Sequence, residues 1–170
     1  RGNPDLDDLD LNPLLAQVDP GPHARHCTLE GRNEVPDTLD ARMVQDARPM
    51  LEDGEKMQLQ YNVRNVHRAV GTRLSAHITR KYGMDRLQPG HITVRLRGST
   101  GQSLGAFAVQ GLKLEVFGDA NDYVGKGLSG GTIVVRPLAS SPIVWSENVI
   151  IGNTCLYGAT AGKLFAAGRA

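Results

Sequence analysis

The fold is decided by the stretch 97–135, which reads RGSTGQSLGAFAVQGLKLEVFGDANDYVGKGLSGGTIVV. Its glycines recur at a fixed offset. Gly98, Gly105 and Gly111 return as Gly118, Gly125 and Gly131, each 20 positions later, and Gly101 is answered by Asn121. Three matches at one offset indicate an internal repeat, and a period of this length is typical of solenoid proteins, in which each coil is one repeat.

Short apolar runs keep the same offset and predict parallel strands at 92–96, 112–116 and 132–135. Their inward residues should form columns, with Val94, Leu114 and Val134 in one column and Leu96, Val116 and Arg136 in the next. Because Arg136 interrupts an apolar column, we expect an insertion to follow it over 137–147, and the repeat to resume at 148–152.

Glycine is needed where the chain turns with a positive φ or where stacked backbones leave no room for a Cβ. We therefore predict a mainly β chain whose residues 91–170 form a parallel β-helix, a single-stranded β-solenoid, cut before its C-terminal end. The predicted structural corners are Gly98, Gly101, Gly105, Gly111, Gly118, Gly125, Gly127, Gly130, Gly131, Gly152, Gly158 and Gly162.

Upstream of the repeat, the pattern changes twice. Residues 1–36 are rich in Pro, Asp, Asn and Gly and are interpreted as an extended, linker-like segment. Residues 37–90 predict a lead-in of helix, strand and helix: a helix at about 39–52, a strand with alternating apolar residues at 57–63, and a second helix at about 66–82 capped by Asn65.

Composition excludes several classes of partner. Lys and Arg number 19 against 18 Asp and Glu, so no charge bias points to nucleic acid or to an anionic membrane surface. No apolar run approaches the length that spans a bilayer. Two separated cysteines, Cys27 and Cys155, argue against a disulfide framework, and we expect a cytoplasmic protein. Because the chain begins at Arg1, we interpret it as a piece of a longer polypeptide.

The segment 125–130 satisfies the dinucleotide pattern G-x-G-x-x-G. In a nucleotide-binding unit these glycines follow a strand directly and open a helix, whose N-terminus holds the pyrophosphate. Here they precede the β-branched run 132–135 instead. A turn of the solenoid is therefore favoured over nucleotide binding.

Other candidate groups are incomplete. His23, His26 and Cys27 are zinc-binding types without a second pair of ligands, and Asp119, Asn121 and Asp122 lack the further oxygens of a calcium loop. Ser99, Ser103 and Ser129 have no histidine and acid nearby in sequence, and His67 on the second predicted helix favours a packing role over that of a general base. We predict no catalytic, cofactor-binding or metal-binding residue in this chain.

Three stretches, 97–107, 118–131 and 150–160, closely resemble the C-terminal glycine-rich (GXGXG) domain of glutamate synthase large subunits, and 65–74 resembles the helix upstream of it. The similarity covers roughly 37–170. Val66 and His67 depart from the pattern, which has Thr and Asp there.

The resemblance implies a right-handed parallel β-helix that follows a glutamine amidotransferase and an FMN-binding synthase barrel with an iron–sulfur cluster. It implies an enzyme that hydrolyses glutamine, channels the ammonia to 2-oxoglutarate and reduces the product to glutamate. The electrons would come from FAD and NADPH or from ferredoxin on partner proteins. We expect this chain to brace the working domains and not to be catalytic by itself.

Its partners would be the remaining domains of the large subunit, with the small electron-supplying subunit as a further candidate. A solenoid leaves an unpaired edge at each uncapped end, so we also expect self-association at the C-terminal edge. Two alternatives remain open: a free-standing subunit like the glycine-rich subunit of formylmethanofuran dehydrogenase, and a small enzyme that uses Asp119, Asp122 and Lys126.

Overall fold

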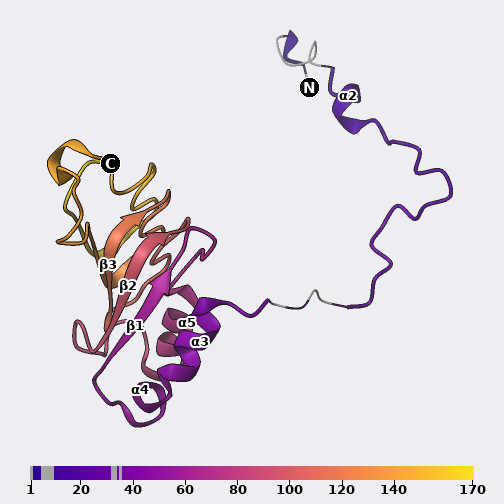
Figure 1. Ribbon diagram of the computed structural model, residues 1–170. Coiled ribbons are helices and arrows are strands. Elements are labelled where there is room, and N and C mark those ends of the chain that lie inside the picture. Colours follow the sequence, from indigo (N-terminus) through magenta and orange to yellow (C-terminus); the bar gives the residue numbers. More distant parts are fainter. Residues whose placement is uncertain (1, 5–9, 32–33, 35) are drawn as a thin grey trace. The chain divides into compact units, whose positions relative to one another are not determined.

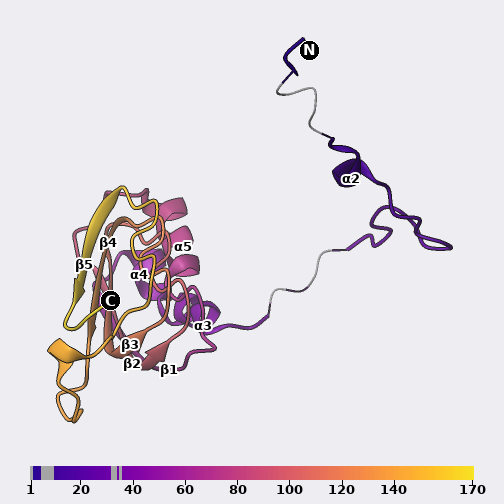
Figure 2. The same cartoon turned by 90° about the horizontal axis from the view of Figure 1, so that it is seen from above.

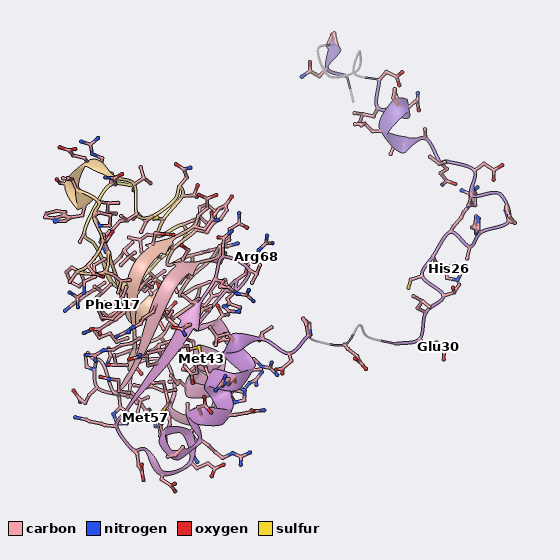
Figure 3. The ribbon with its side chains drawn as sticks, viewed as in Figure 1. His26, Glu30, Met43, Met57, Arg68 and Phe117 are labelled. Atoms are coloured by element: carbon pink, nitrogen blue, oxygen red, sulfur yellow. The ribbon has the colours of Figure 1, made fainter. Side chains whose placement is uncertain are left out.

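The computed structural model describes residues 2–4, 10–31, 34 and 36–170. The chain divides into two compact units, Arg1–Val35 and Pro36–Ala170. In the described part of the first unit, a four-residue helix, α2 (Asn12–Leu15), lies among turns and irregular backbone. Its residues Leu14 and Leu15 are exposed, as are His26 and Glu30 further along (Figure 3).

The second unit begins with two short helices, α3 (Leu39–Asp46) and α4 (Arg48–Asp53). Thr38 caps α3 by accepting a hydrogen bond from the Ala41 amide, and Gly54 ends α4 with a φ of 75°. The predicted single helix at 39–52 is thus wrong in one respect, because it breaks at Ala47. The cause is Pro49, which has no N–H to continue the hydrogen-bond ladder and whose ring would clash with the Gln45 carbonyl group in an uninterrupted helix.

The predicted helix at 66–82 is shorter in the structure, where α5 spans Thr72–Tyr82 and begins after Gly71. Ala69 (φ 51°) and Gly71 (φ 96°) adopt left-handed backbone that no α-helix can contain, so the residues before them form turns instead. Asn65 is therefore not the helix cap, and Val66 is exposed rather than part of an apolar stripe.

Five strands form a single parallel sheet in sequence order: β1 (Met57–Val63), β2 (Ile92–Thr100), β3 (Leu112–Ala120), β4 (Ser129–Arg136) and β5 (Ala161–Ala166). Figures 1 and 2 show the strands side by side, with α3, α4 and α5 gathered together on one side of the sheet. The unit is therefore mainly β. None of the helices in the described residues is long and apolar enough to cross a membrane.

The predicted columns are correct between β2 and β3, where Val94 pairs with Leu114 at an offset of 20. They are wrong at β4, because Leu114 pairs with Ile133 and Val116 pairs with Val135. Since side chains alternate between the two faces of a strand, this one-residue shift reverses the assignment of every residue in β4.

The shift has a local cause in the turn before β4. Phe107 and Gly127 share left-handed backbone at an offset of 20, whereas the next left-handed pair, Gly111 and Gly130, is offset by only 19. The second turn is thus one residue shorter, and Arg136 points outward beside Phe117 instead of interrupting the core.

The segment 148–152 resumes the interrupted unit after the insertion, as predicted. Ile151 bridges to Ala120 at the end of β3, and Val149 bridges to Arg169, so this segment continues the course of β4 after the insertion at 137–147. The next strand of the sheet is β5, in which Ala166 pairs with Val135.

One continuous apolar core joins the inward strand residues to the helices and connecting loops. Met43, Leu74 and Ile78 from the helices are fully buried in the same cluster as Val94 and Leu114. Through this core the five strands, the helices and the connecting turns pack into one body.

Candidate functional site

The connections after β2, β3 and β4 stack on one another through backbone hydrogen bonds. The Gly105 amide donates to the Val70 carbonyl oxygen, the Gly125 amide to Leu104 and the Leu156 amide to Val124, each at 2.8 Å. Gly105, Gly125 and Leu156 share left-handed backbone, with φ of 65°, 67° and 59°. Each turn therefore repeats the conformation of the turn beneath it.

The predicted glycines occupy different places in this arrangement. Gly98 lies in β2, Gly118 in β3, Gly130 and Gly131 in β4, and Gly162 in β5. The others lie in the connections: Gly101, Gly105, Gly111, Gly125, Gly127, Gly152 and Gly158. A Cβ at Gly98 would collide with the Val63 carbonyl oxygen, and one at Gly118 with the Gly98 carbonyl oxygen. Glycine is thus required there by stacked backbone.

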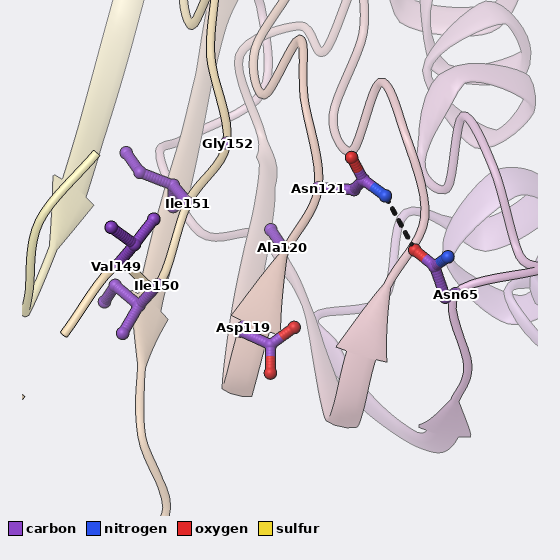
Figure 4. A pocket seen from close by; sticks show the side chains of 8 residues that line it. All are labelled: Asn65, Asp119, Ala120, Asn121, Val149, Ile150, Ile151 and Gly152. Carbon is purple, nitrogen blue, oxygen red and sulfur yellow. Dashed lines mark hydrogen bonds between the residues drawn. The ribbon is translucent and has the colours of Figure 1, made fainter. Parts of the chain in front are cut away.

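A polar ladder crosses the coils next to these glycines (Figure 4). The Asn121 amide group donates to Asn65 Oδ1 at 2.9 Å, and Ser99 Oγ donates to Asp119 Oδ2 at 3.0 Å. Asp119 and Asn121 line a shallow hollow of about 270 Å³ together with the segment 149–152. The Ser99–Asp119 hydrogen bond joins the neighbouring strands β2 and β3, whereas the Asn121–Asn65 hydrogen bond reaches across β2 to the segment that follows β1.

The side chains considered for a calcium site or a small enzyme have other partners in the structure. Asp122 Oδ1 accepts the Asn153 amide at 2.8 Å, and the Lys126 ammonium group lies 6.0 Å from the centre of the Tyr123 ring. Within the residues that the structure describes, no three His, Cys, Asp or Glu side chains are grouped to hold a metal ion. The described contacts of Asp119 and Asp122 are therefore hydrogen bonds to the neighbouring strand and the neighbouring connection.

The G-x-G-x-x-G segment does not open a helix. Its amides are already used, since Gly125 donates to Leu104, Gly127 to the Tyr157 carbonyl oxygen and Leu128 to Gly125. The segment then enters β4 directly. Phosphate binding by such a motif depends on free N–H groups at a helix N-terminus, and the described backbone offers none here.

The described contacts do not join the remaining predicted candidates into a site. His23, His26 and Cys27 lie exposed on the N-terminal unit. Ser129 Oγ donates to the Gly127 carbonyl oxygen, and His67 Nδ1 accepts the Arg64 amide. Ser103 lies in a turn with a φ of 64°. The described geometry brings none of these serines together with His67.

Sequence reasoning missed the role of Asp40, which is 6% exposed. Its carboxylate accepts the Gly71 amide at 3.0 Å and the Arg73 amide at 2.6 Å, and so caps α5 from a different helix. Burial raises the pKa of this carboxyl, against the lowering effect of the two amides. Asp40 lies on the same helical face as the buried Met43 and Ala47. An acidic residue on an otherwise apolar helical face is the sequence pattern from which its buried role could have been predicted.

Two further ionisable groups are shifted by their surroundings. Burial and the hydrogen bond to Asp46 raise the pKa of Tyr61. On the outer face of the sheet, hydrogen bonds from Lys113 and Arg95 hold the pKa of Glu115 below its usual value, although partial burial opposes them. Both groups join neighbouring elements and face no common cavity.

Comparison with known proteins places this chain in a family. Residues 40–170 match the model of the GXGXG motif. The chain is 77% identical over all its 170 residues to the glutamate synthase [NADPH] large chain of Azospirillum brasilense, of which it covers 11%.

Two other relatives are more distant. The glutamate synthase [NADH] of Saccharomyces cerevisiae is 40% identical to this chain, in a match that covers 95% of this chain and 8% of the relative. The ferredoxin-dependent glutamate synthase 2 of Synechocystis is 53% identical, in a match that covers 65% of this chain and 7% of the relative. The chain thus spans about a tenth of the length of the curated relatives it matches. Because the motif model covers residues 40–170 and the whole chain matches a glutamate synthase large chain, the chain belongs to the GXGXG-motif family as it occurs in the large chains of glutamate synthases.

Proposed function

We propose that these residues are a structural domain of a glutamate synthase large chain and brace the domains that make glutamate from glutamine and 2-oxoglutarate. The observation that carries the proposal is sequence identity. The whole chain, from its first residue to its last, is 77% identical to one part of a much longer glutamate synthase chain. The related formylmethanofuran dehydrogenase subunit is the alternative, and the relatives found favour the glutamate synthase reading.

The proposed architecture is a right-handed parallel β-helix over 91–170, after a linker-like segment at 1–36 and a lead-in of helix, strand and helix at 37–90. It is supported by the offset of 20 between β2 and β3 and by the hydrogen bonds between successive connections. Right-handedness is expected because crossovers between parallel strands are almost always right-handed. The glycines named above are proposed as the positions that permit stacking.

A bracing role suits this body because its core runs without interruption from the helices to the last coils. Stacked coils should resist bending, since the inward side chains of the central strands pack against those of the strands on either side. The described residues offer no ligand set for an iron–sulfur cluster. We propose that FMN, the cluster and all catalysis belong to the other domains of the proposed large chain, as the resemblance to glutamate synthases implies.

The proposed electron donor is NADPH. It is named for the relative that matches the whole chain at 77% identity, whereas the ferredoxin-dependent relative matches 65% of the chain at 53%. The small electron-supplying subunit would then be a partner of the large chain. The proposed compartment is the cytoplasm, in line with the free thiols of Cys27 and Cys155.

The size of the native polypeptide tests this proposal. Antibodies against residues 36–170 would capture the protein from its source cells, and mass spectrometry would measure the chain that carries these residues together with any bound flavin. We expect one polypeptide of far more than 170 residues that co-purifies with flavin. A free chain of about this length in another complex would favour the stand-alone subunit.

A further inference from the structure

The outer face of the sheet, on the side away from the helices, carries an excess of positive charge. The side chains that point outward from β2, β3, β4 and β5 include five cations: Arg95, Arg97, Lys113, Arg136 and Lys163. The outward carboxylates of these strands are Glu115 and, near the end of β3, Asp119. The outward polar side chains of β1 are neutral: Gln58, Gln60 and Asn62.

Three of the five cations have no acidic partner. Glu115 is shared by Arg95, whose Nε lies 3.0 Å from Oε2, and by Lys113. The other three are exposed and form no salt bridge with a described residue: Arg97, Arg136 and Lys163. Because unpaired charges of one sign are gathered on this face, it is complementary to a surface that carries carboxylates.

Two of the unpaired cations lie on either side of an aromatic ring. Arg97 pairs with Phe117 and Phe117 with Arg136, so the three residues form one row across strands that are about 4.8 Å apart. The central carbon of the Arg136 guanidinium group lies 4.5 Å from the centre of the Phe117 ring. Stacking of this kind holds the guanidinium plane in place and leaves its N–H groups free to bind a carboxylate.

An apolar pocket of about 310 Å³ lies at the end of this row, where β4 passes into the insertion. Its walls are formed by Arg136, by Ala167 after β5 and by residues of the insertion that include Leu138, Ile143 and Trp145. Trp145 is 57% exposed. Among the described residues that line the pocket, Arg136 is the charged one. The pocket therefore has room for a bulky apolar side chain, with an unpaired guanidinium group beside it.

We propose that this face binds an acidic segment from the rest of the large chain, in which an apolar side chain enters the pocket and neighbouring carboxylates pair with Arg97 and Arg136. The proposal rests on the proposed function. About nine tenths of the 77% identical relative lies outside the matched part, and a segment in the same polypeptide is present at a high effective concentration.

A protein segment suits the face better than a nucleic acid. The walls of the pocket beside Arg136 are largely aliphatic, and the charge of the whole chain is nearly balanced. Nucleic-acid binding depends on an extended series of phosphate contacts. Arginine and tryptophan, in contrast, are the residue types that contribute most to the centres of protein interfaces.

Zero-length cross-linking of the complete native polypeptide tests the charge complementarity directly. A water-soluble carbodiimide joins a lysine amine to a carboxylate that is in contact with it. Lys163 supplies an amine on the face, and the variants Arg97→Lys and Arg136→Lys each place a further amine at a proposed contact without changing the charge. After digestion, mass spectrometry identifies the coupled carboxylates.

We expect the three amines to couple to one segment outside residues 1–170 in which Asp or Glu flanks an apolar residue. Raising the salt concentration before coupling should lower the yield, since exposed charge pairs are screened. Amines that couple to nothing outside residues 1–170, to a second, isotope-labelled copy or to a separate polypeptide would overturn the proposal. So would binding of a labelled oligonucleotide that Arg136→Glu abolishes.

Charge reversal shows whether the face itself is responsible. Arg136→Glu replaces an attraction by a repulsion and should lower the coupling of Lys163 to that segment by about threefold or more. Trp145→Ala removes one wall of the pocket and should also lower it. The matched control Lys81→Glu, at an exposed position of α5 on the helical side of the sheet, should leave the yield unchanged. Equal yields in all three variants would contradict the proposal.

The two proposals fail differently. If the native polypeptide proves to be a free chain of about 170 residues, the proposed function is wrong. If the polypeptide is long and flavin-bound but the amines on this face couple to no segment outside 1–170, only the assignment of the outer face is wrong.

Discussion

At the scale of single residues, two glycines of similar appearance in the sequence carry different constraints. Gly98 adopts a φ of 120°, and a Cβ there would meet the Val63 carbonyl oxygen of the neighbouring strand. Gly158 adopts a φ of 67°, but nothing lies within 4 Å of the position its Cβ would take. The first is limited by space and conformation, the second by conformation alone.

Alanine substitution at both positions separates these two effects. Gly158→Ala should lower the free energy of unfolding by about 1 kcal/mol, the cost of left-handed backbone for a non-glycine residue. Gly98→Ala should cost at least about 3 kcal/mol, because the paired strands must also move apart. Urea denaturation of the two variants beside the wild type measures both. If both variants lose the same free energy of unfolding, the stacked backbone is not the reason that position 98 requires glycine.

Asp40 predicts an unusual dependence of stability on pH. Burial raises its pKa in the folded protein above the unfolded value of 3.8. The folded state therefore binds this proton more tightly than the unfolded state. The contribution of Asp40 to stability is largest below about pH 3.8 and is lost as the pH rises through the raised folded value.

The variant Asp40→Asn removes this titration and one of the two amide contacts, so it should be less stable by about 1–3 kcal/mol. The stability advantage of the wild type over the variant should be greater at pH 4 than at pH 7. Thermal unfolding of both proteins at the two pH values measures this difference, and an advantage that shrinks on acidification would show that the two amide contacts outweigh burial.

At the scale of elements, the sequence predicts the strands well and their register less well. The glycine offset and the apolar runs locate β1, β2 and β3 because each strand alternates around a buried face. The register of β4 is missed because Gly130 and Gly131 are adjacent, so a match at offset 20 hides a turn that is one residue shorter. The start of α5 is missed because Ala69 and Gly71 take their backbone from stacking on the next coil, which no local pattern reveals.

The polar contacts of the site are harder still to predict. Asn65 and Asn121 are 56 positions apart, and Asp40 caps a helix that begins 32 positions later. Such pairs depend on how the coils stack, and hydrogen-bonding residue types occur throughout the chain. Residue type alone therefore marked Asp119, Asn121 and Asp122 as a group of oxygen-bearing side chains but did not give their partners.

The register of β4 makes a direct prediction about two adjacent valines. Val135 is fully buried and pairs with Val116, whereas Val134 is half-buried on the outer face. Val135→Ala should cost about 2 kcal/mol through lost burial and the cavity left behind, and Val134→Ala about 0.5 kcal/mol or less. Chemical denaturation compares the pair, and the reverse order of losses would restore the register expected from the offset of 20.

At the scale of the whole folded unit, the two edges of the sheet differ. On β1, Tyr61 and Val63 are buried, and the Tyr61 hydroxyl group donates to Asp46 on α3 at 2.7 Å. On β5 no residue is buried, and Leu164 is only partly covered by the core. An uncovered parallel edge next to an open core is the part of the molecule most ready to pair with another strand.

The 170-residue chain by itself should therefore self-associate through β5. In sedimentation velocity, its average mass should rise above 18.3 kDa as the concentration increases. Ala166 pairs with the inward-facing Val135, so Ala166→Lys places an inward charge on the edge strand and should hold the chain at the monomer mass. Phe165→Lys, on the outer face of the same strand, is the matched control and should still associate. A wild-type chain that stays monomeric at high concentration, with β5 amides fully protected from hydrogen exchange, would show that this edge is already closed within one molecule.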